Sequence, residues 1–267
     1  MKIFVHSKGR ASLKTGTLSW LQPVWKDVVI VCPATEVDLY RIHWPKVLIY
    51  QVPVTYDLPE VQNAIARRFV TDRKFVMMDD DLRFAYRPDP AVPALLQAFE
   101  QIPYMMRQIE ILLDAVAHVT ICPRQGNNRV DAPITYVTAA RSVLAYRRDV
   151  LERHDVLFNR SPSKSDYDAT LQLFRLGYRN ACINIYTHDQ VGGPTLAGGC
   201  TESRTESVHE RASTRLSELH PGFVKVVVKQ KPDWKFPRHD VIVSWKKAYE
   251  SADKVRTPPL FIKRSSP

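Results

Sequence analysis

Paired cysteines and long apolar runs are missing from this chain of 267 residues. Its four cysteines contain no C-x-x-C pair, so neither a zinc ribbon nor a redox dithiol motif is indicated. No apolar run approaches the roughly 18 residues that a membrane-spanning helix needs. The apolar stretch after Met1 is too short for a secretory signal, and the chain contains no internal repeat. We therefore expect reduced thiols in a cytoplasmic protein that does not enter a membrane.

The charge of the chain is strongly uneven. The formal net charge is +10, and residues 221–267 hold eleven Lys and Arg against four Asp and Glu. Aromatic residues such as Trp234 and Trp245 lie between these charges, a mixture suited to attracting phosphate and stacking on bases. A solvated basic surface would have the same composition. We predict a domain at 1–220 and a basic extension at 221–267 that contacts a polyanionic partner.

Short apolar runs alternate with helical segments in a way that is typical of a parallel sheet covered by helices. One run, 46–52, leads to the cap-like sequence Asp57-Leu58-Pro59-Glu60 and a predicted helix at 59–70. The predicted fold class is α/β, with a Rossmann-type, mostly parallel sheet and helices on both faces. The predicted strands are 3–6, 28–32, 46–52, 75–78, 118–122, 141–148 and 181–186, and further helices are expected at roughly 93–117 and 166–176.

Three consecutive aspartates follow the apolar run at 75–78. A core cannot absorb three carboxylates, so Asp79, Asp80 and Asp81 must emerge where the strand ends, which is the ligand crevice of an open α/β sheet. In an extended chain Asp79 and Asp81 share one side, and Asp80 points away, towards a ribose or a backbone amide. We predict that Asp79 and Asp81 bind Mn²⁺ or Mg²⁺, which would grip a diphosphate. The alternative is an acidic turn without a ligand.

Such a site suits transfer of a sugar from a nucleotide diphosphate, because the metal stabilises the departing diphosphate as a Lewis acid. An acceptor hydroxyl then needs a base, and the segment at 164–168 opens a helix where a carboxylate can reach the crevice. Asp166 is the candidate base. Ser165, Asp166 and Asp168 are equally suited to capping this helix, and spacing does not separate the two roles.

Further polar residues lie where the predicted strands end. His188 precedes a glycine-rich stretch, a predicted lid, and is a candidate third metal ligand. Ser7, Lys8 and Arg10 follow the first strand, where they would hold the nucleotide. Asn63 and Arg67 share one helical face opposite the apolar stripe and could also reach a ligand. Each has an ordinary alternative as a surface histidine, a polar turn or solvent-facing side chains.

Four segments resemble, in the right order, those of a family 2-like glycosyltransferase of GT-A fold. HSKGR resembles the family's first strand exit, NAIARRF its Asn/Arg helix, MMDDD its D-x-D strand and SDYDATLQLFRLGY its base helix. The family's usual Glu before the base is Ser165 here. The resemblance implies a nucleotide-sugar donor, a divalent metal and Asp166 as the base.

A narrower resemblance covers most of the chain. The segments IFVHSKGR, FVMMDDDLRF, PRQGNNR, SDYDATLQLFRLGYRNA, GGCTESR, HPGFVKVVVK and VSWKKAY resemble phage glycosyltransferases associated with TET/JBP-type dioxygenases. This resemblance implies transfer of a sugar to 5-hydroxymethylcytosine in DNA, in the host cytoplasm. It implies acceptor contacts from Arg124 and Arg129 near phosphate and from Asn127 or Asn128 near a base edge.

The leading hypothesis is an inverting, metal-dependent transfer from a UDP-sugar to 5-hydroxymethylcytosine in double-stranded DNA. The acceptor hydroxyl lies at the major-groove edge of a duplex, so base flipping is not required by the sequence. A glycosyltransferase acting on a glycan, lipid or protein is an alternative, and a non-catalytic basic DNA-binding protein is another. A nucleotidyltransferase would need a second carboxylate cluster, which the acids at 166 and 168 fit poorly.

Overall fold

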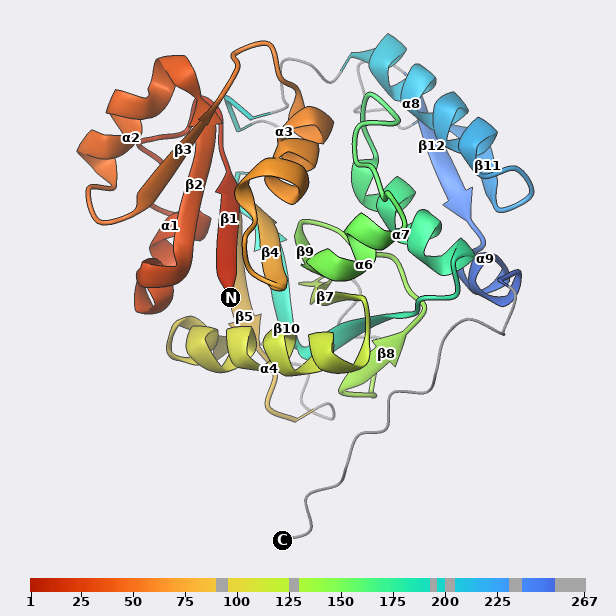
Figure 1. The fold of residues 1–267 in the computed structure, drawn as a ribbon, viewed down its shortest axis with the longest axis horizontal. Coiled ribbons are helices and arrows are strands. Elements are labelled where there is room, and N and C mark those ends of the chain that lie inside the picture. Colours follow the sequence, from red (N-terminus) through yellow and green to blue (C-terminus); the bar gives the residue numbers. More distant parts are fainter. Residues whose placement is uncertain (90–95, 125–129, 193–195, 200–204, 231–236, 253–267) are drawn as a thin grey trace, which may run out of the picture.

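The computed structural model describes residues 1–89, 96–124, 130–192, 196–199, 205–230 and 237–252. Its core is one large mixed sheet, with strands in the order β3-β2-β1-β4-β9-β7-β10-β5-β6 and with β8 paired to β10 (Figure 1). The strands are β1 (Lys2–His6), β2 (Val28–Pro33), β3 (Leu48–Val52), β4 (Lys74–Asp79), β5 (Leu82–Tyr86), β6 (Leu96–Gln97), β7 (His118–Pro123), β8 (Ile134–Tyr136), β9 (Val143–Arg147) and β10 (Asn180–Gln190).

The direction of the strands determines which residues meet at the ligand edge. β1 pairs in parallel with both β2 and β4, so His6 lies opposite Asp79 at the carboxyl end. β9 runs antiparallel to β4, with Val143 opposite Met78, so the beginning of β9 reaches the same edge. β5, β8 and β9 run against the direction of the other strands. The predicted α/β class with a mostly parallel sheet is confirmed.

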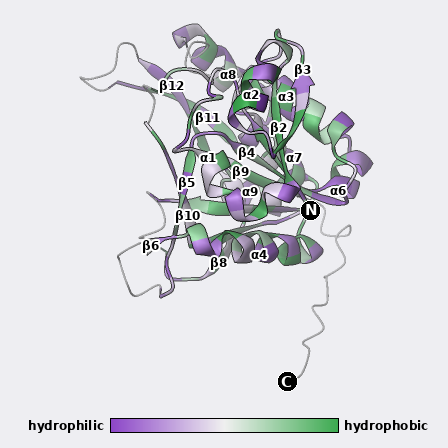
Figure 2. Cartoon of the chain, turned by 90° about the vertical axis from the view of Figure 1, so that its left-hand side faces the viewer, coloured by the Kyte–Doolittle hydropathy of each residue, from purple (hydrophilic) through white to green (hydrophobic). Residues whose placement is uncertain are grey.

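Helices cover both faces of the sheet because the side chains of each strand alternate between two cores. Val5 and Met78 face the core beneath α4, whereas Phe4 and Met77 face the core beneath α3, α6 and α7. Figure 2 shows α4 as a mixture of hydrophilic and hydrophobic residues, as expected for a half-buried helix. The helices of this domain are α1 (Thr17–Trp20), α2 (Val37–His43), α3 (Leu58–Ala64), α4 (Ile102–Ala115), α6 (Arg148–Arg153) and α7 (Ser165–Arg175).

The described C-terminal residues pack against α7. α8 (Glu206–Leu219), the antiparallel hairpin β11 (Val224–Lys229) and β12 (Arg238–Val243), and α9 (Trp245–Glu250) follow one another at the blue end of Figure 1. Leu216 of α8, Val224 of β11 and Ala248 of α9 share a small core with Leu171 and Phe174 of α7. This core crosses the predicted boundary at residue 220.

Several predicted elements differ from the structure. The helix expected at about 93–117 begins only at Ile102, after the short strand β6, and β5 follows directly on the acidic turn. Residues 188–190, expected in a loop, are the end of β10. The main partner of β5 is β10, far along the chain, and its other partner is the two-residue strand β6, so local patterns carry little signal for it. No helix in the described ranges is long and apolar enough to cross a membrane.

Candidate functional site

Two adjoining cavities open at the carboxyl edge of the sheet. The first, of about 220 Å³, lies between the ends of β1 and β4 and the start of α3. The second, of about 670 Å³, lies between the sheet edge, the start of α7, α8 and β12. Asp57, Leu58, Asp79 and Gln190 line both. A ligand in one cavity can therefore meet a ligand in the other beside Asp79.

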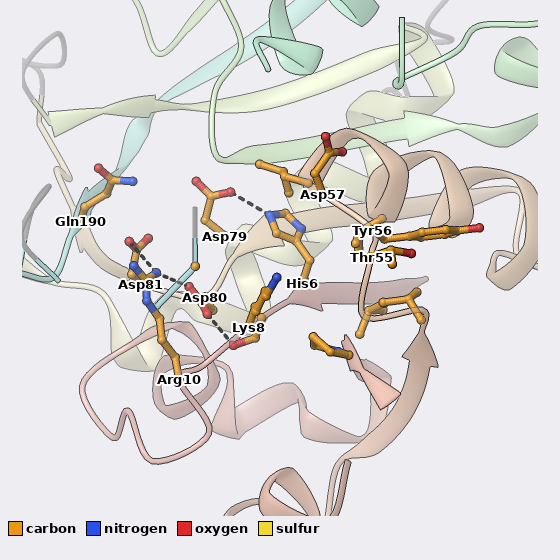
Figure 3. A pocket seen from close by; sticks show the side chains of 17 residues that line it. His6, Lys8, Arg10, Thr55, Tyr56, Asp57, Asp79, Asp80, Asp81 and Gln190 are labelled. Carbon is orange, nitrogen blue, oxygen red and sulfur yellow. Dashed lines mark hydrogen bonds and ion pairs between the residues drawn. The ribbon is translucent and has the colours of Figure 1, made fainter. Parts of the chain in front are cut away.

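The acidic turn forms one side of the first cavity (Figure 3). The carboxylate of Asp79 lies 2.9 Å from His6 Nε2. Nη1 of Arg10 donates to Asp80 at 2.7 Å and to Asp81 at 3.1 Å. The expectation that Asp80 points away from Asp81 is wrong, because β4 ends at Asp79 and the next two residues form a turn, where strand alternation does not hold.

The three aspartates differ in their electrostatics. Burial, followed by the charges of Asp79 and Asp80, raises the pKa of Asp81 to about 6 despite the opposing effect of Arg10. For Asp79 burial acts in the same direction, but the hydrogen bond and charge of His6 outweigh it and the net pKa is lowered. Asp79 is therefore the more readily ionised of the two predicted ligands.

Asp81 in the acidic turn and His188 on β10 carry donor atoms that suit a divalent cation. Oδ1 of Asp81 and both ring nitrogens of His188 are buried without a hydrogen-bond partner among the described residues. Burial lowers the pKa of His188 to about 4, which keeps the imidazole neutral, as metal binding requires. Within the described ranges no three His, Cys, Asp or Glu side chains already form a metal site. Mg²⁺ commonly needs only one or two carboxylates, with substrate phosphates and water completing its shell.

The residues after β1 lie together with the acidic turn. Ser7, Lys8 and Arg10 all line the first cavity. The hydroxyl of Ser7 donates to Asp80 and contacts the hydroxyl of Tyr40. Arg10 donates to the carbonyls of Ala197 at 3.0 Å and Gly198 at 3.2 Å, so the described part of the glycine-rich segment is held against this strand exit.

Asn63 and Arg67 do not reach either cavity, and their predicted role as ligand contacts is not supported. Oδ1 of Asn63 accepts from the backbone of Phe158, and Arg67 forms an ion pair with Asp155. The helical face opposite the apolar stripe is covered by the segment that follows α6. The sequence periodicity located the core side of this helix but not what packs on its other side.

Asp166 lies in the second cavity with Asp79 and His188. Its Oδ1 accepts from the backbone of Tyr167 at 2.8 Å, within the first turn of α7. Burial raises the pKa of Asp166 to about 7, the opposing charge of Arg141 being the next largest effect. A carboxyl with this pKa exchanges protons near neutral pH, which suits a general base.

Asp168, also considered for capping, has a different environment. Its side chain is fully buried, with Oδ1 2.7 Å from Nε2 of His220 and Oδ2 3.4 Å from Nε of Arg160. His220 follows α8, so this contact ties the C-terminal part of the chain to α7. Asp168 does not line either cavity.

The predicted acceptor residues are only partly described. Arg124 lies exposed at the second cavity, 3.4 Å from Asp189, whereas Asn127, Asn128 and Arg129 lie outside the described residues.

Three arginines that line the second cavity, Arg141, Arg211 and Arg238, were not named individually as site residues, although Arg238 belongs to the basic extension that was expected to contact a polyanion. Their sequence neighbourhoods carry no motif, and Arg141 was expected inside a strand rather than just before one. Asp57 was foreseen only as a cap, and its capping box with Glu60 is present.

Comparisons with known proteins bear on the same segments. A family model described as TET-Associated Glycosyltransferase matches residues 1–192. No curated protein sequence matches the chain significantly.

Among solved structures, GalNAc-T7 with UDP, GalNAc and Mn²⁺ is 7% identical, with 81% of this chain and 48% of that chain covered and a TM-score of 0.47. A CMP:2-keto-3-deoxy-manno-octonic acid synthetase complexed with CTP is 11% identical, with 68% and 88% covered and a TM-score of 0.42. At these TM-scores the structural similarities carry no argument.

The family match covers well over half of the chain and includes the strand exit after β1, the acidic turn and the start of α7. These segments supply most of the lining of the two cavities, whereas α8 and β12 lie beyond the matched residues. The chain belongs to the TET-associated glycosyltransferase family and is a glycosyltransferase.

Proposed function

We propose that this glycosyltransferase moves a sugar from a nucleotide sugar, specifically a UDP-sugar, to 5-hydroxymethylcytosine in DNA in a metal-dependent reaction. The observation that carries the proposal is the pair of adjoining cavities, one beside the acidic turn and the other containing Asp166. A donor in the first and an acceptor in the second would meet beside Asp79, which lines both.

The donor half of the proposal rests on the chemistry of the first cavity. Asp79 and Asp81, with His188, would hold Mn²⁺ or Mg²⁺, and the ion would supply charge stabilisation for the departing diphosphate. Ser7, Lys8 and Arg10 would bind the nucleotide from the opposite strand exit.

The acceptor half rests on Asp166, which would take the proton of the attacking hydroxyl. The hydroxyl would attack from the second cavity while the diphosphate leaves into the first, and we propose inversion at the anomeric carbon. Exposed arginines at the second cavity favour an acceptor that carries phosphates.

The first experiment is an acceptor and donor screen. The protein is incubated with Mn²⁺, a panel of nucleotide sugars and matched DNA containing either cytosine or 5-hydroxymethylcytosine, and the nucleosides are then analysed by mass. We expect a sugar-sized gain only in the hydroxymethylated DNA. Donor hydrolysis without any gain would retain the donor site and require a different acceptor.

The metal assignment is tested with Asp81→Ala. This variant should lose at least roughly 100-fold in metal-dependent transfer, because the ion would lack a ligand at the leaving group. Asp38→Ala, at a side chain that is 88% exposed on α2, is the control and should retain full activity. Undiminished metal-dependent turnover by Asp81→Ala would rule out the proposed ligand role.

A further inference from the structure

The second cavity has the candidate base, Asp166, among its lining residues. Its walls are the sheet edge, the segment before α7, and α8 together with β12. Asp166 and Asp79 keep part of their surface open to the cavity, 26% in the case of the Asp79 side chain, while protein surrounds them on the other sides. The reacting hydroxyl must therefore enter this cavity to meet Asp166.

Charged side chains of both signs line this cavity. Exposed arginines line it from four separate segments: Arg124 after β7, Arg141 before β9, Arg211 on α8 and Arg238 on β12. Asp79 and Asp166 line it as well, and the positive charges of Arg141 and Lys164 act on Asp166. Phosphates are attracted to exposed arginines and repelled by carboxylates. The phosphates of an acceptor nucleotide would therefore lie at the arginines, with its base nearer Asp166.

We propose that the acceptor nucleotide rotates out of the duplex and inserts its base into the second cavity, with the neighbouring phosphates held by the four arginines. The inference rests on the proposed function, since it assumes a DNA acceptor. On a paired base the hydroxymethyl group lies in the major groove, which is about 12 Å wide and 8.5 Å deep. A protruding helix or strand can enter that groove, whereas Asp166 is only partly exposed, in a cavity whose lining also includes residues of the sheet edge, α8 and β12.

The size and lining of the cavity suit an extruded base. Its volume of about 670 Å³ is within the range of pockets that enclose small molecules. Tyr167 lines it and is held in orientation by Trp245, whose ring meets it at 82° with centroids 5.1 Å apart. A fixed aromatic ring is a typical surface for an unstacked base.

The reaction balances in this arrangement. The hydroxymethyl oxygen forms a bond to the anomeric carbon of the sugar as the bond from that carbon to the diphosphate breaks. The proton of the hydroxyl goes to Asp166, and the nucleoside diphosphate leaves with the electron pair. Insertion of the base brings the hydroxyl to the side of Asp79 where the first cavity adjoins.

The test uses duplexes with 2-aminopurine next to the target base, the full-length protein, UDP and Mn²⁺. Extrusion of the target unstacks its neighbour, so fluorescence should rise several-fold on binding, while anisotropy reports binding independently. Asp166→Asn should give the same rise but no sugar transfer. Binding without a rise would overturn base extrusion and leave the proposed function standing, whereas absence of DNA binding would overturn both.

Transfer rates give a second, independent readout. With the nucleotide sugar that supports transfer, a target opposite a mismatched base or an abasic site should react several-fold faster than a matched target, because less pairing energy is lost on extrusion. Equal or slower transfer to the mismatched duplex would overturn the inference. No transfer to any of these DNAs would instead count against the DNA acceptor itself.

Discussion

At the scale of single residues, Asp166 and Asp81 show how burial tunes carboxyl groups. Both have raised pKa values, of about 7 and about 6 respectively, and in both cases burial is the largest cause. A buried carboxyl that keeps contact with a cavity costs stability when it ionises and becomes a better proton acceptor. Burial of Asp166 therefore lowers the stability of the folded protein at neutral pH and at the same time provides a base that works there.

The rate of transfer should depend on pH through Asp166. Because the base must be deprotonated, the rate at saturating substrate should rise with pH and level off above about 7. Initial rates across buffers of constant ionic strength measure this. Asp166→Asn should lose at least roughly 100-fold in rate. A flat profile between pH 5.5 and 8, with product release excluded as the slow step, would contradict the assignment.

The same residue should make the protein less stable at high pH. The folded-state pKa of Asp166 lies above the unfolded value, so between about pH 4 and pH 7 the folded state binds more protons and stability falls as the pH rises. Asp166→Asn should therefore melt a few degrees higher than the unmodified protein at pH 8, and the difference should shrink towards pH 5. Thermal unfolding at several pH values tests it, and an equal difference at all pH values would argue against this cause.

At the scale of elements, the glycine-rich segment shows how one backbone approaches another. Gly198 has φ +78°, and a Cβ there would lie 2.9 Å from the carbonyl oxygens of both Lys8 and Gly9. Gly222 has φ +79°, but a Cβ there would meet nothing within 4 Å among the described residues. The two glycines thus share a left-handed conformation but differ in the space around them.

Gly198→Ala should raise the KM for the donor nucleotide several-fold, because the added methyl group displaces the strand exit that carries Lys8 and Arg10. Gly222→Ala is the matched control: it carries the same backbone strain, about 1 kcal/mol, without the clash. Steady-state kinetics with varied donor concentration separate the effect of the clash from the effect of backbone strain. Equal effects of both substitutions on the KM would show that backbone strain alone is responsible.

The contact between α7 and the end of α8 should matter for stability. Asp168 and His220 are 0% and 1% exposed and hydrogen bonded at 2.7 Å. His220→Leu leaves a buried carboxylate short of a partner and should lower the free energy of unfolding by about 3 kcal/mol. Arg67→Leu breaks an ion pair whose Asp155 partner is 77% exposed and should cost less than about 1 kcal/mol. Urea unfolding of the two variants measures both losses in the free energy of unfolding. Equal losses would contradict the expectation that the buried contact matters more than the exposed ion pair.

At the scale of the whole molecule, arginines from distant parts of the chain meet at the cavity proposed for the acceptor. The net charge is +10, and exposed arginines from four segments distant in sequence converge on the second cavity. Long-range attraction of DNA needs only the net charge, but orientation of a nucleotide needs this convergence.

Binding to DNA should weaken steeply as salt rises. Arg211→Gln and Arg238→Gln should each reduce the slope of log K against log salt by about one, since each would remove one phosphate contact. Lys46→Gln, in the separate pocket beside Trp44, is the control and should leave the slope nearly unchanged. Fluorescence anisotropy with a labelled duplex gives the slopes. An unchanged slope in both arginine variants would exclude them as phosphate contacts.

Local sequence determined the parallel strands β1 to β4 and the position of the acidic turn that follows them. Runs such as the one at 75–78 report burial directly, and three carboxylates can only follow such a strand where it leaves the core. The helix at 165–175, and its termination at Gly177, were likewise predictable from periodicity and capping residues. These features depend on interactions within a few residues.

The composition of the site was decided by contacts between distant segments. The antiparallel direction of β9 brings Arg141 to the ligand edge, and the packing of α8 and β12 adds the outer wall of the second cavity. Arg10 donates to both Asp80 and Asp81, which lie some seventy residues further along the chain. Periodicity records which side of an element is buried but not which element covers it or in which direction a strand pairs, because these depend on the packing of the whole chain.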